Sequence, residues 1–393
     1  MISAHELAKH LSLAILGTVS LMQLLVLPGM VGVLVDGSPI TEQQAGIAAS
    51  ANFSGAALIA LVMAFQMQRL PLRAISIAAL LFAAAADAVS AFSANNFELF
   101  LFARFAAGIG AGTVYVSTLA AYARSKDPER GFGLFVTLQF IVSGLALYVL
   151  PVYSSDLGVK GMFLIIAGLD LAALTFCVSL PALSAIKERN TDHLHGIVVT
   201  GSSLKTLGSA AAIFAALAFG LYEAANTAQF TYVERLGVSM ALNEHEIGSA
   251  LLIASFIGIP GAFSVIIVGN RFGHVVPIIL GVGLAIVGLL LLITAESYVD
   301  YFLGSLFLGF SWAFCLPFIQ GLLAGLDRTG GVLAAGSFCT TLGSTLGPYA
   351  AATLILNNDY DRAFILAIAL FVVAALMFYL ARPKHSDEDT QYA

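Results

Sequence analysis

Charged residues are scarce in this sequence. They make up 10% of its 393 residues, while 59% are hydrophobic; soluble domains average about 25% charged and about 45–50% apolar residues. This composition excludes an ordinary soluble globular protein. Basic residues number 17 and stand singly, so the clustered positive surface of a nucleic-acid-binding protein is also excluded.

Cysteine is nearly absent. Cys177, Cys315 and Cys339 all fall in apolar segments, where a free thiol behaves as a small apolar side chain, so no disulfide framework is expected. The seven histidines lie in loops, tails or segment ends, which argues against a metal site. There is no G-x-x-x-x-G-K-[ST] loop for a nucleotide. We therefore expect no cofactor, no metal and no catalytic residues, and predict that the protein is not an enzyme.

Long apolar runs are abundant. A transmembrane helix needs about 20 mostly apolar residues, and polar, Gly/Pro or Asn/Ser positions divide the chain into such runs. The pattern predicts an all-α, multi-pass membrane protein in a lipid bilayer. The twelve predicted spans cover residues 11–35, 42–67, 72–94, 97–123, 131–153, 161–182, 206–233, 245–268, 275–295, 301–326, 331–356 and 362–381.

The longest polar stretch lies in the middle of the chain. Residues 184–205 carry charges and no sustained apolar period, which indicates a cytoplasmic linker. The predicted domains are a six-helix half over 1–183, this linker, a second six-helix half over 206–382 and a polar tail over 383–393. The first span is too long for a signal sequence, so we expect it to remain as an anchor.

The basic residues indicate the orientation. With the amino terminus inside, Lys160, Arg235 and Arg362 fall outside and Arg104 falls within the membrane, which leaves 13 of the 17 basic residues on the cytoplasmic side. Lys and Arg near span ends resist translocation. The distribution predicts that both termini are cytoplasmic, and we expect the protein in a bacterial inner membrane.

Two short loops repeat one signal about half the chain apart. Ala64–Arg73 reads AFQMQRLPLR and Ile266–Val275 reads IIVGNRFGHV. Both resemble the G-x-x-x-D-R-x-G-R-[RK] loops of the major facilitator superfamily, with Gln68 and Asn270 in the acidic position. The resemblance implies an internal duplication and a conformational-gating role for the matching residues, which are Arg69, Arg73, Asn270, Arg271 and Gly273.

A third stretch carries the same resemblance. RFAAGIGAG, Arg104 to Gly112, is similar to the R-x-x-x-G-x-G pattern of proton-coupled members of the family. The Gly-Pro series usual in family antiporters is missing from 136–153, and a similar series occurs in 336–348. The resemblance implies two pseudo-symmetric six-helix bundles, a monomer and secondary transport, as in compact bacterial sugar or drug exporters. Import by symport stays open.

Four ionisable residues lie deep inside predicted spans, away from the span ends, namely Asp87, Arg104, Asp170 and Glu223. Such residues are costly in a membrane and mark functional paths by default. Counting about 1.5 Å per residue places Arg104 and Asp87 about 10 Å below the outer surface, with Asp170 at nearly the same level. Arg104 either ties helices together by pairing with Asp87 or Asp170, or faces a cavity and tunes a nearby carboxylate.

Glu223 is the predicted proton carrier, because a buried glutamate exchanges protons whereas arginine stays charged. Asn226 and Phe230 share its helical face. Further candidates for substrate contact lie on spans that line the cavity in the family. Each of these side chains could equally form a hydrogen bond between helices instead of contacting substrate. The predicted substrate-binding residues are Gln23, Tyr115, Tyr122, Gln139, Asn226, Phe230, Trp312 and Gln320.

The predicted function is secondary active transport of a small organic solute by alternating access. The coupling ion is predicted to be a proton, and efflux by antiport is favoured over uptake by symport. The alternatives are a sensor without transport activity and a membrane-embedded enzyme on the same fold.

Overall fold

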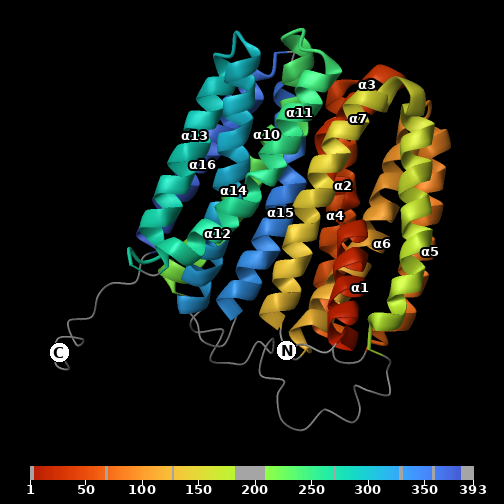
Figure 1. The fold of residues 1–393 in the computed structure, drawn as a ribbon, viewed down its shortest axis with the longest axis horizontal. Helices are drawn as coiled ribbons and strands as arrows, with labels where there is room; N and C mark the ends of the chain where they lie inside the picture. The colour runs from red at the N-terminus through yellow and green to blue at the C-terminus, as the bar shows by residue number, and fades with distance from the viewer. Residues whose placement is uncertain are drawn as a thin grey trace.

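A computed structural model of the chain describes residues 4–66, 70–125, 128–181, 209–269, 271–326, 331–355 and 359–381. In these ranges the regular elements are all helices (Figure 1). They are α1 Ala4–Ser20, α2 Met22–Leu25, α3 Leu27–Gly37, α4 Glu42–Gln66, α5 Leu72–Ser93, α6 Phe97–Ala123, α7 Pro128–Ala173, the 3-10 helix η1 Leu174–Ser179, α10 Ala210–Ser239, α11 Glu244–Phe256, α12 Gly258–Val268, α13 Val275–Ile293, α14 Tyr298–Leu326, α15 Gly331–Leu354 and α16 Asp361–Leu380.

Nine helical stretches in the described part of the chain are long and apolar enough to cross a membrane. Large apolar side chains also cover the outside of the molecule: Phe102 is 69% exposed and Ile267 is 75% exposed. A soluble protein buries most such side chains, whereas lipid solvates them. The prediction of an all-α integral membrane protein is confirmed, and the number of twelve spans stays a prediction.

Polar residues begin several helices. Asn96 accepts a hydrogen bond from the Leu99 N–H at 3.2 Å, and Ser209 accepts one from Ala212 at 3.2 Å. Asn243 forms a capping box with Glu246. Such caps satisfy N–H groups that have no partner within the helix. The polar residues between the apolar runs therefore predicted these helix starts well.

The first predicted span, 11–35, is not one helix. It is divided into α1, α2 and α3 by non-helical turns at Leu21 and Val26. Pro28 in the first turn of α3 has no N–H and cannot continue an earlier helix. The Leu25 carbonyl near this break accepts a hydrogen bond from Ser143 Oγ at 2.9 Å. Prediction of a single span missed these breaks.

Two other predicted spans, 131–153 and 161–182, form α7 and η1, and α7 turns sharply at Gly158, whose φ is +55°. Glycine adopts this left-handed backbone without steric cost. Span 245–268 is divided between Phe256 and Gly258 into α11 and α12. Sequence periodicity found the apolar segments and missed where their axes change direction.

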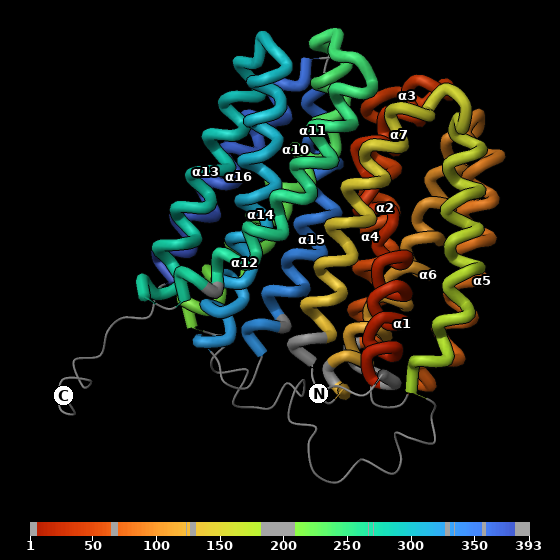
Figure 2. The backbone as a smooth tube through the Cα atoms, in the orientation of Figure 1, coloured from red at the N-terminus to blue at the C-terminus, as the bar shows by residue number. Residues whose placement is uncertain are grey.

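The helices form two groups side by side. The first helix group, α1 to η1, is coloured red to yellow-green in Figure 1, and the second helix group, α10 to α16, is coloured green to blue. Figure 2 shows the same separation in the backbone trace. The groups meet where α4 packs on α15, α7 on α11 and α3 on α10. We call the end of the molecule where α3 ends and α4 begins the distal end.

Glycines allow close helix contacts within each group. A Cβ atom at Gly108 of α6 would lie 1.9 Å from the Asn52 carbonyl oxygen of α4, and one at Gly343 of α15 would lie 2.1 Å from the Gly220 carbonyl oxygen of α10. No larger residue fits unless the backbones separate. These contacts hold α6, which carries Arg104, and α10, which carries Glu223, against their neighbours.

Candidate functional site

Arg104 is fully buried inside the first helix group. It forms an ion pair with Asp87 of α5, and its Nε donates to Ser90 Oγ at 2.9 Å. The guanidinium also lies over the Phe163 ring of α7, 4.3 Å from the centroid. Such cation–π contact stabilises a desolvated cation. The positive charge is therefore held entirely by side chains of its own group.

Two more predicted residues join Arg104 and Asp87. Gln23 of α2 donates from Nε2 to Asp87 Oδ1 at 3.2 Å, and Asp170 of α7 lies within electrostatic range of Asp87 and Arg104. We call Gln23, Asp87, Arg104 and Asp170 the Arg104 cluster. The structure thus brings together the three charges predicted to share one depth. It also places Gln23, predicted for substrate contact, against a carboxylate of this cluster.

Glu223 of α10 lies half-buried near the junction of the two helix groups. Ser344 of α15 places its Oγ 3.5 Å from Glu223 Oε1, and Trp312 of α14 lies close to the same carboxylate. Tyr115, on α6 of the first group, lies within electrostatic range of it. The Trp312 ring packs edge-on against Phe140 of α7 at 5.8 Å between centroids. Side chains from both groups therefore surround this carboxyl group.

The other candidates for substrate contact are more dispersed. Asn226 is buried and donates to the Tyr222 carbonyl of its own helix at 2.9 Å, and Phe230 packs partly buried against the core. Tyr122 is fully buried and donates to the His10 carbonyl at 2.9 Å, inside the first group. Gln139 is half-buried and Gln320 is exposed. The structure gathers Tyr115 and Trp312 near Glu223, and it packs Tyr122 elsewhere.

The predicted gating residues that the structure describes, Arg73, Arg271 and Gly273, lie at the end opposite the distal end. Arg73 donates from Nε to the Leu180 carbonyl at 3.0 Å and from Nη2 to the Val178 carbonyl at 2.6 Å. It thereby ties the start of α5 to the end of η1 within the first group. Arg271 and Gly273 lie in an exposed turn after α12, and Gly273 has φ +64°. Arg69 and Asn270 lie outside the described residues.

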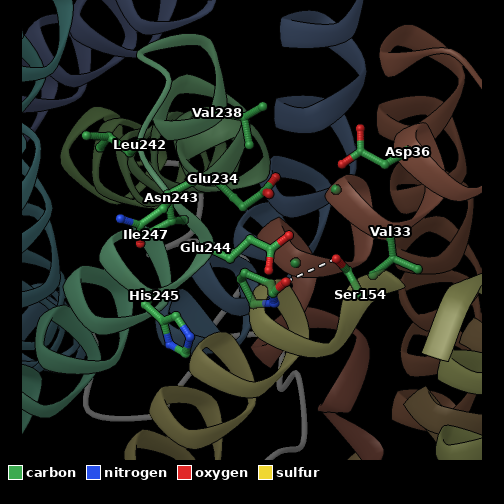
Figure 3. Close-up of a pocket in the computed structure, with 13 residues that line it drawn as sticks. Val33, Asp36, Ser154, Glu234, Val238, Leu242, Asn243, Glu244, His245 and Ile247 are labelled. Atoms are coloured by element: carbon green, nitrogen blue, oxygen red, sulfur yellow. Dashed lines mark hydrogen bonds between the residues drawn. The ribbon is translucent and has the colours of Figure 1, made fainter. Parts of the chain in front are cut away.

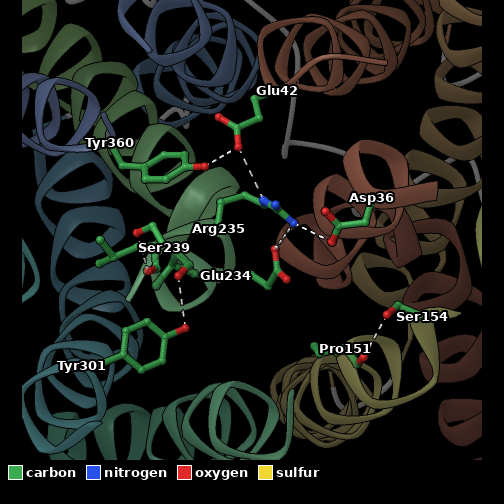
Figure 4. Close-up of polar contacts among 11 residues, drawn as sticks. Asp36, Glu42, Pro151, Ser154, Glu234, Arg235, Ser239, Tyr301 and Tyr360 are labelled. Atoms are coloured by element: carbon green, nitrogen blue, oxygen red, sulfur yellow. Dashed lines mark hydrogen bonds and ion pairs between the residues drawn. The ribbon is translucent and has the colours of Figure 1, made fainter. Parts of the chain in front are cut away.

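A charged contact that the sequence analysis missed joins the two groups at the distal end (Figure 4). Arg235 of α10 donates from Nη1 to Asp36 Oδ2 of α3 at 2.8 Å, and its Nε lies 3.6 Å from Glu42 Oε1 of α4. Tyr360, just before α16, donates to the same Glu42 carboxylate. We call Asp36, Glu42, Arg235 and Tyr360 the distal clasp. The adjacent charges Glu234 and Arg235 in a long apolar helix were the available signal.

Tyr360 lies outside the membrane-spanning segments. Its burial, together with the nearby Glu42 carboxylate, raises the pKa of the phenol above its ordinary value, which is about 10. The phenol therefore stays protonated and donates to Glu42 at neutral pH.

A cavity of about 410 Å³ lies beside the clasp, between the two groups (Figure 3). The cavity is lined by Gly29, Gly32, Val33, Asp36, Pro151, Ser154, Glu234, Val238, Leu242, Asn243, Glu244, His245 and Ile247.

In the described part of the chain, no group of three or more His, Cys, Asp or Glu side chains could hold a metal ion.

Comparison with known proteins gives one family and many similar folds. The family model described as Major Facilitator Superfamily matches residues 10–327. The crystal structure of the nucleoside transporter NupG is similar with a TM-score of 0.72 and 14% identity, over 96% of this chain and 100% of that one.

Two further solved structures resemble the chain. The D-xylose-proton symporter has a TM-score of 0.73 and 16% identity, covering 96% of this chain and 97% of its own. FucP in the outward conformation has a TM-score of 0.62 and 18% identity, covering 96% and 98%. At these identities the likeness shows the fold alone. No curated protein sequence matches the chain.

Proposed function

Because the chain belongs to the Major Facilitator Superfamily, we propose that it is a proton-coupled secondary transporter of a small organic solute. The family assignment makes the protein a transporter and not an enzyme. The coupling ion, the class of solute and the direction of transport are the proposed parts. Proton coupling is proposed on the helix pattern that begins at Arg104, and efflux in exchange for protons is the proposed direction on the resemblance to compact bacterial exporters.

The observation that carries the proposal is the position of Glu223. Its half-buried carboxyl lies beside Trp312 and Ser344 of the second group and within range of Tyr115 of the first. A glutamate in such surroundings binds and releases a proton as its environment changes. Rings from both groups at the same point suit an organic solute. Proton and solute would therefore meet where the two groups meet.

The proposed topology follows the sequence. Twelve spans form two halves over 1–183 and 206–382, both termini are cytoplasmic, and the distal end faces outward. Support comes from the paired helix groups and from the distal clasp that connects them. In alternating access the halves rock about a central site, so the clasp would form when the outer end closes and separate when it opens. We propose a monomer in a bacterial inner membrane.

Flux in reconstituted vesicles tests this proposal. Solutes are first screened by thermal stabilisation of the purified protein, and those that bind are followed under imposed pH or sodium gradients. We expect Glu223→Gln to abolish flux driven by a pH gradient while leaving membrane insertion and solute exchange intact. Glu98→Gln, an exposed carboxylate on α6, is the matched control and should transport as the wild type does.

Three outcomes would contradict parts of the proposal. Full pH-driven flux in Glu223→Gln would remove Glu223 as the proton carrier. Flux that responds only to a sodium gradient would show that the coupling ion is not a proton. A wild-type protein that binds solute without any flux would be a sensor.

A further inference from the structure

The cavity at the distal end is built from both helix groups. Its walls come from α3 and α7 on one side and from α10 and α11 on the other. A volume of about 410 Å³ falls in the range of about 300–1,000 Å³ typical of small-molecule sites. Figure 3 shows the carboxylates of Asp36, Glu234 and Glu244 turned toward one shared space.

Glu234 is the unusual member of this wall. Its side chain is only 5% exposed, and Oε2 has no hydrogen-bond partner in the structure. The guanidinium of Arg235 lies 3.9 Å away, too far for a hydrogen bond, and donates to Asp36 instead at 2.8 Å. A buried carboxylate oxygen without a donor is costly. Glu234 lines the cavity, so an under-bonded carboxylate stands in its wall with which a cationic ligand could pair.

The charge around the cavity favours a cation. Asp36, Glu234 and Glu244 line it and Glu42 lies nearby in the clasp, while Arg235 is the cation that pairs with them among the described residues. The described residues present no metal-binding group of three ligands, and the cavity is far larger than a bare ion. Apolar walls at Val33, Val238 and Ile247 suit a carbon skeleton.

The space depends on a glycine of the opposite group. A Cβ atom at Gly32 of α3 would lie 2.7 Å from both carboxylate oxygens of Glu234. Any side chain at this position would displace the Glu234 carboxylate. The carboxylate of the second group is therefore seated against the backbone of the first.

We propose that this cavity binds a small organic cation whose ammonium group pairs with the Glu234 carboxylate, with Glu244 at the rim. A ligand that contacts both groups stabilises the conformation in which they are together, so its binding favours the form with a closed distal end. This site goes beyond the proposed function, because it requires neither proton coupling nor flux.

Calorimetry of the full-length protein in detergent, with putrescine as the probe, tests the site. We expect saturable binding and an increase in Tm, with no response to butanediol, which has the same skeleton without charge. Glu234→Gln should weaken binding by about tenfold or more, the size of one lost charge-assisted hydrogen bond. Glu244→Gln, exposed at the rim, should weaken it by less, and the control Glu98→Gln should bind as the wild type does.

Several results would overturn the proposal. They are absence of putrescine binding to the wild type, equal binding of butanediol, equal affinity in Glu234→Gln, and displacement of putrescine by equimolar Mg²⁺. If Glu234→Gln does not fold, Gly32→Ala provides the second test, because its methyl group displaces the Glu234 carboxylate and should also abolish binding. Glu223→Gln should retain putrescine binding, so a failed flux experiment and a failed binding experiment are distinguishable.

Discussion

Arg104 and Arg235 both lie inside long helices, and their surroundings differ. Arg104 contacts Asp87, Ser90 and Phe163, all in the first helix group. Arg235 starts from the second group and reaches Asp36 and Glu42 in the first. A contact inside one group moves with it as a unit, whereas a contact between groups must break when they separate. The contacts of Arg104 are suited to holding one helix group together. The contacts of Arg235 are suited to responding when one group moves relative to the other.

The largest expected effect comes from removing Arg104. Arg104→Ala leaves the Asp87 carboxylate buried without its cation, and breaking a buried pair in this way typically costs about 3–5 kcal/mol. We expect a clear loss of Tm in detergent and poor recovery of folded protein. The double variant Asp87→Ala/Arg104→Ala should recover part of the loss, since no charge remains unpaired. A single variant as stable as the wild type would contradict a structural role for the Arg104 cluster.

Removing Arg235 should instead change conformation. Arg235→Gln weakens the contact between the groups, and the loss of one partly buried charged contact, about 1.5–3 kcal/mol, shifts the population toward separated distal ends. Spin labels at Ser155 of α7 and Ser239 of α10, with the three native cysteines replaced, should report longer distances. The stability of each group should change little.

Arg362→Gln is the matched control for this experiment. Arg362 pairs with Asp359 at 3.4 Å near the same end, but both residues are exposed and belong to the second group. Exposed pairs contribute about 0–1 kcal/mol, so the distance distribution should stay that of the wild type. Equal shifts in the two variants would show that the clasp has no special role.

The smallest expected effect is that of Tyr360→Phe, which removes one hydrogen bond to Glu42 at a cost of about 0.5–1.5 kcal/mol. Because the folded protein raises the pKa of Tyr360, the stabilisation is complete below the ordinary tyrosine pKa of about 10 and is lost as the pH rises through the folded value. Thermal unfolding of the wild type and of Tyr360→Phe at neutral pH measures the contribution of this hydrogen bond. The same comparison at alkaline pH measures how much of that contribution is lost. The exposed Tyr153 provides the control variant, Tyr153→Phe; a loss of the same size there would refute the assignment.

The sequence predicted contacts between neighbouring helices better than contacts between distant ones. Asp87 and Arg104 lie on consecutive antiparallel helices joined by a short turn, so counting residues was enough to place them at one depth. Asp36 and Arg235 belong to helices far apart in the chain, and no local periodicity indicates that their ends meet. The hydrogen bond from Gln23 to Asp87 could not be predicted either. The helix around Gln23 is broken at Leu21 and Val26, so counting residues does not give the direction in which its side chain points.

The contact between Phe140 and Trp312 has a practical consequence. The chain contains a single tryptophan, and its ring packs against an aromatic ring of the opposite helix group. All tryptophan fluorescence of the protein therefore originates at the boundary between the groups, beside Glu223. If the two groups separate at this boundary as proposed, the emission wavelength and the quenching by iodide should change with its exposure to water, without any attached label.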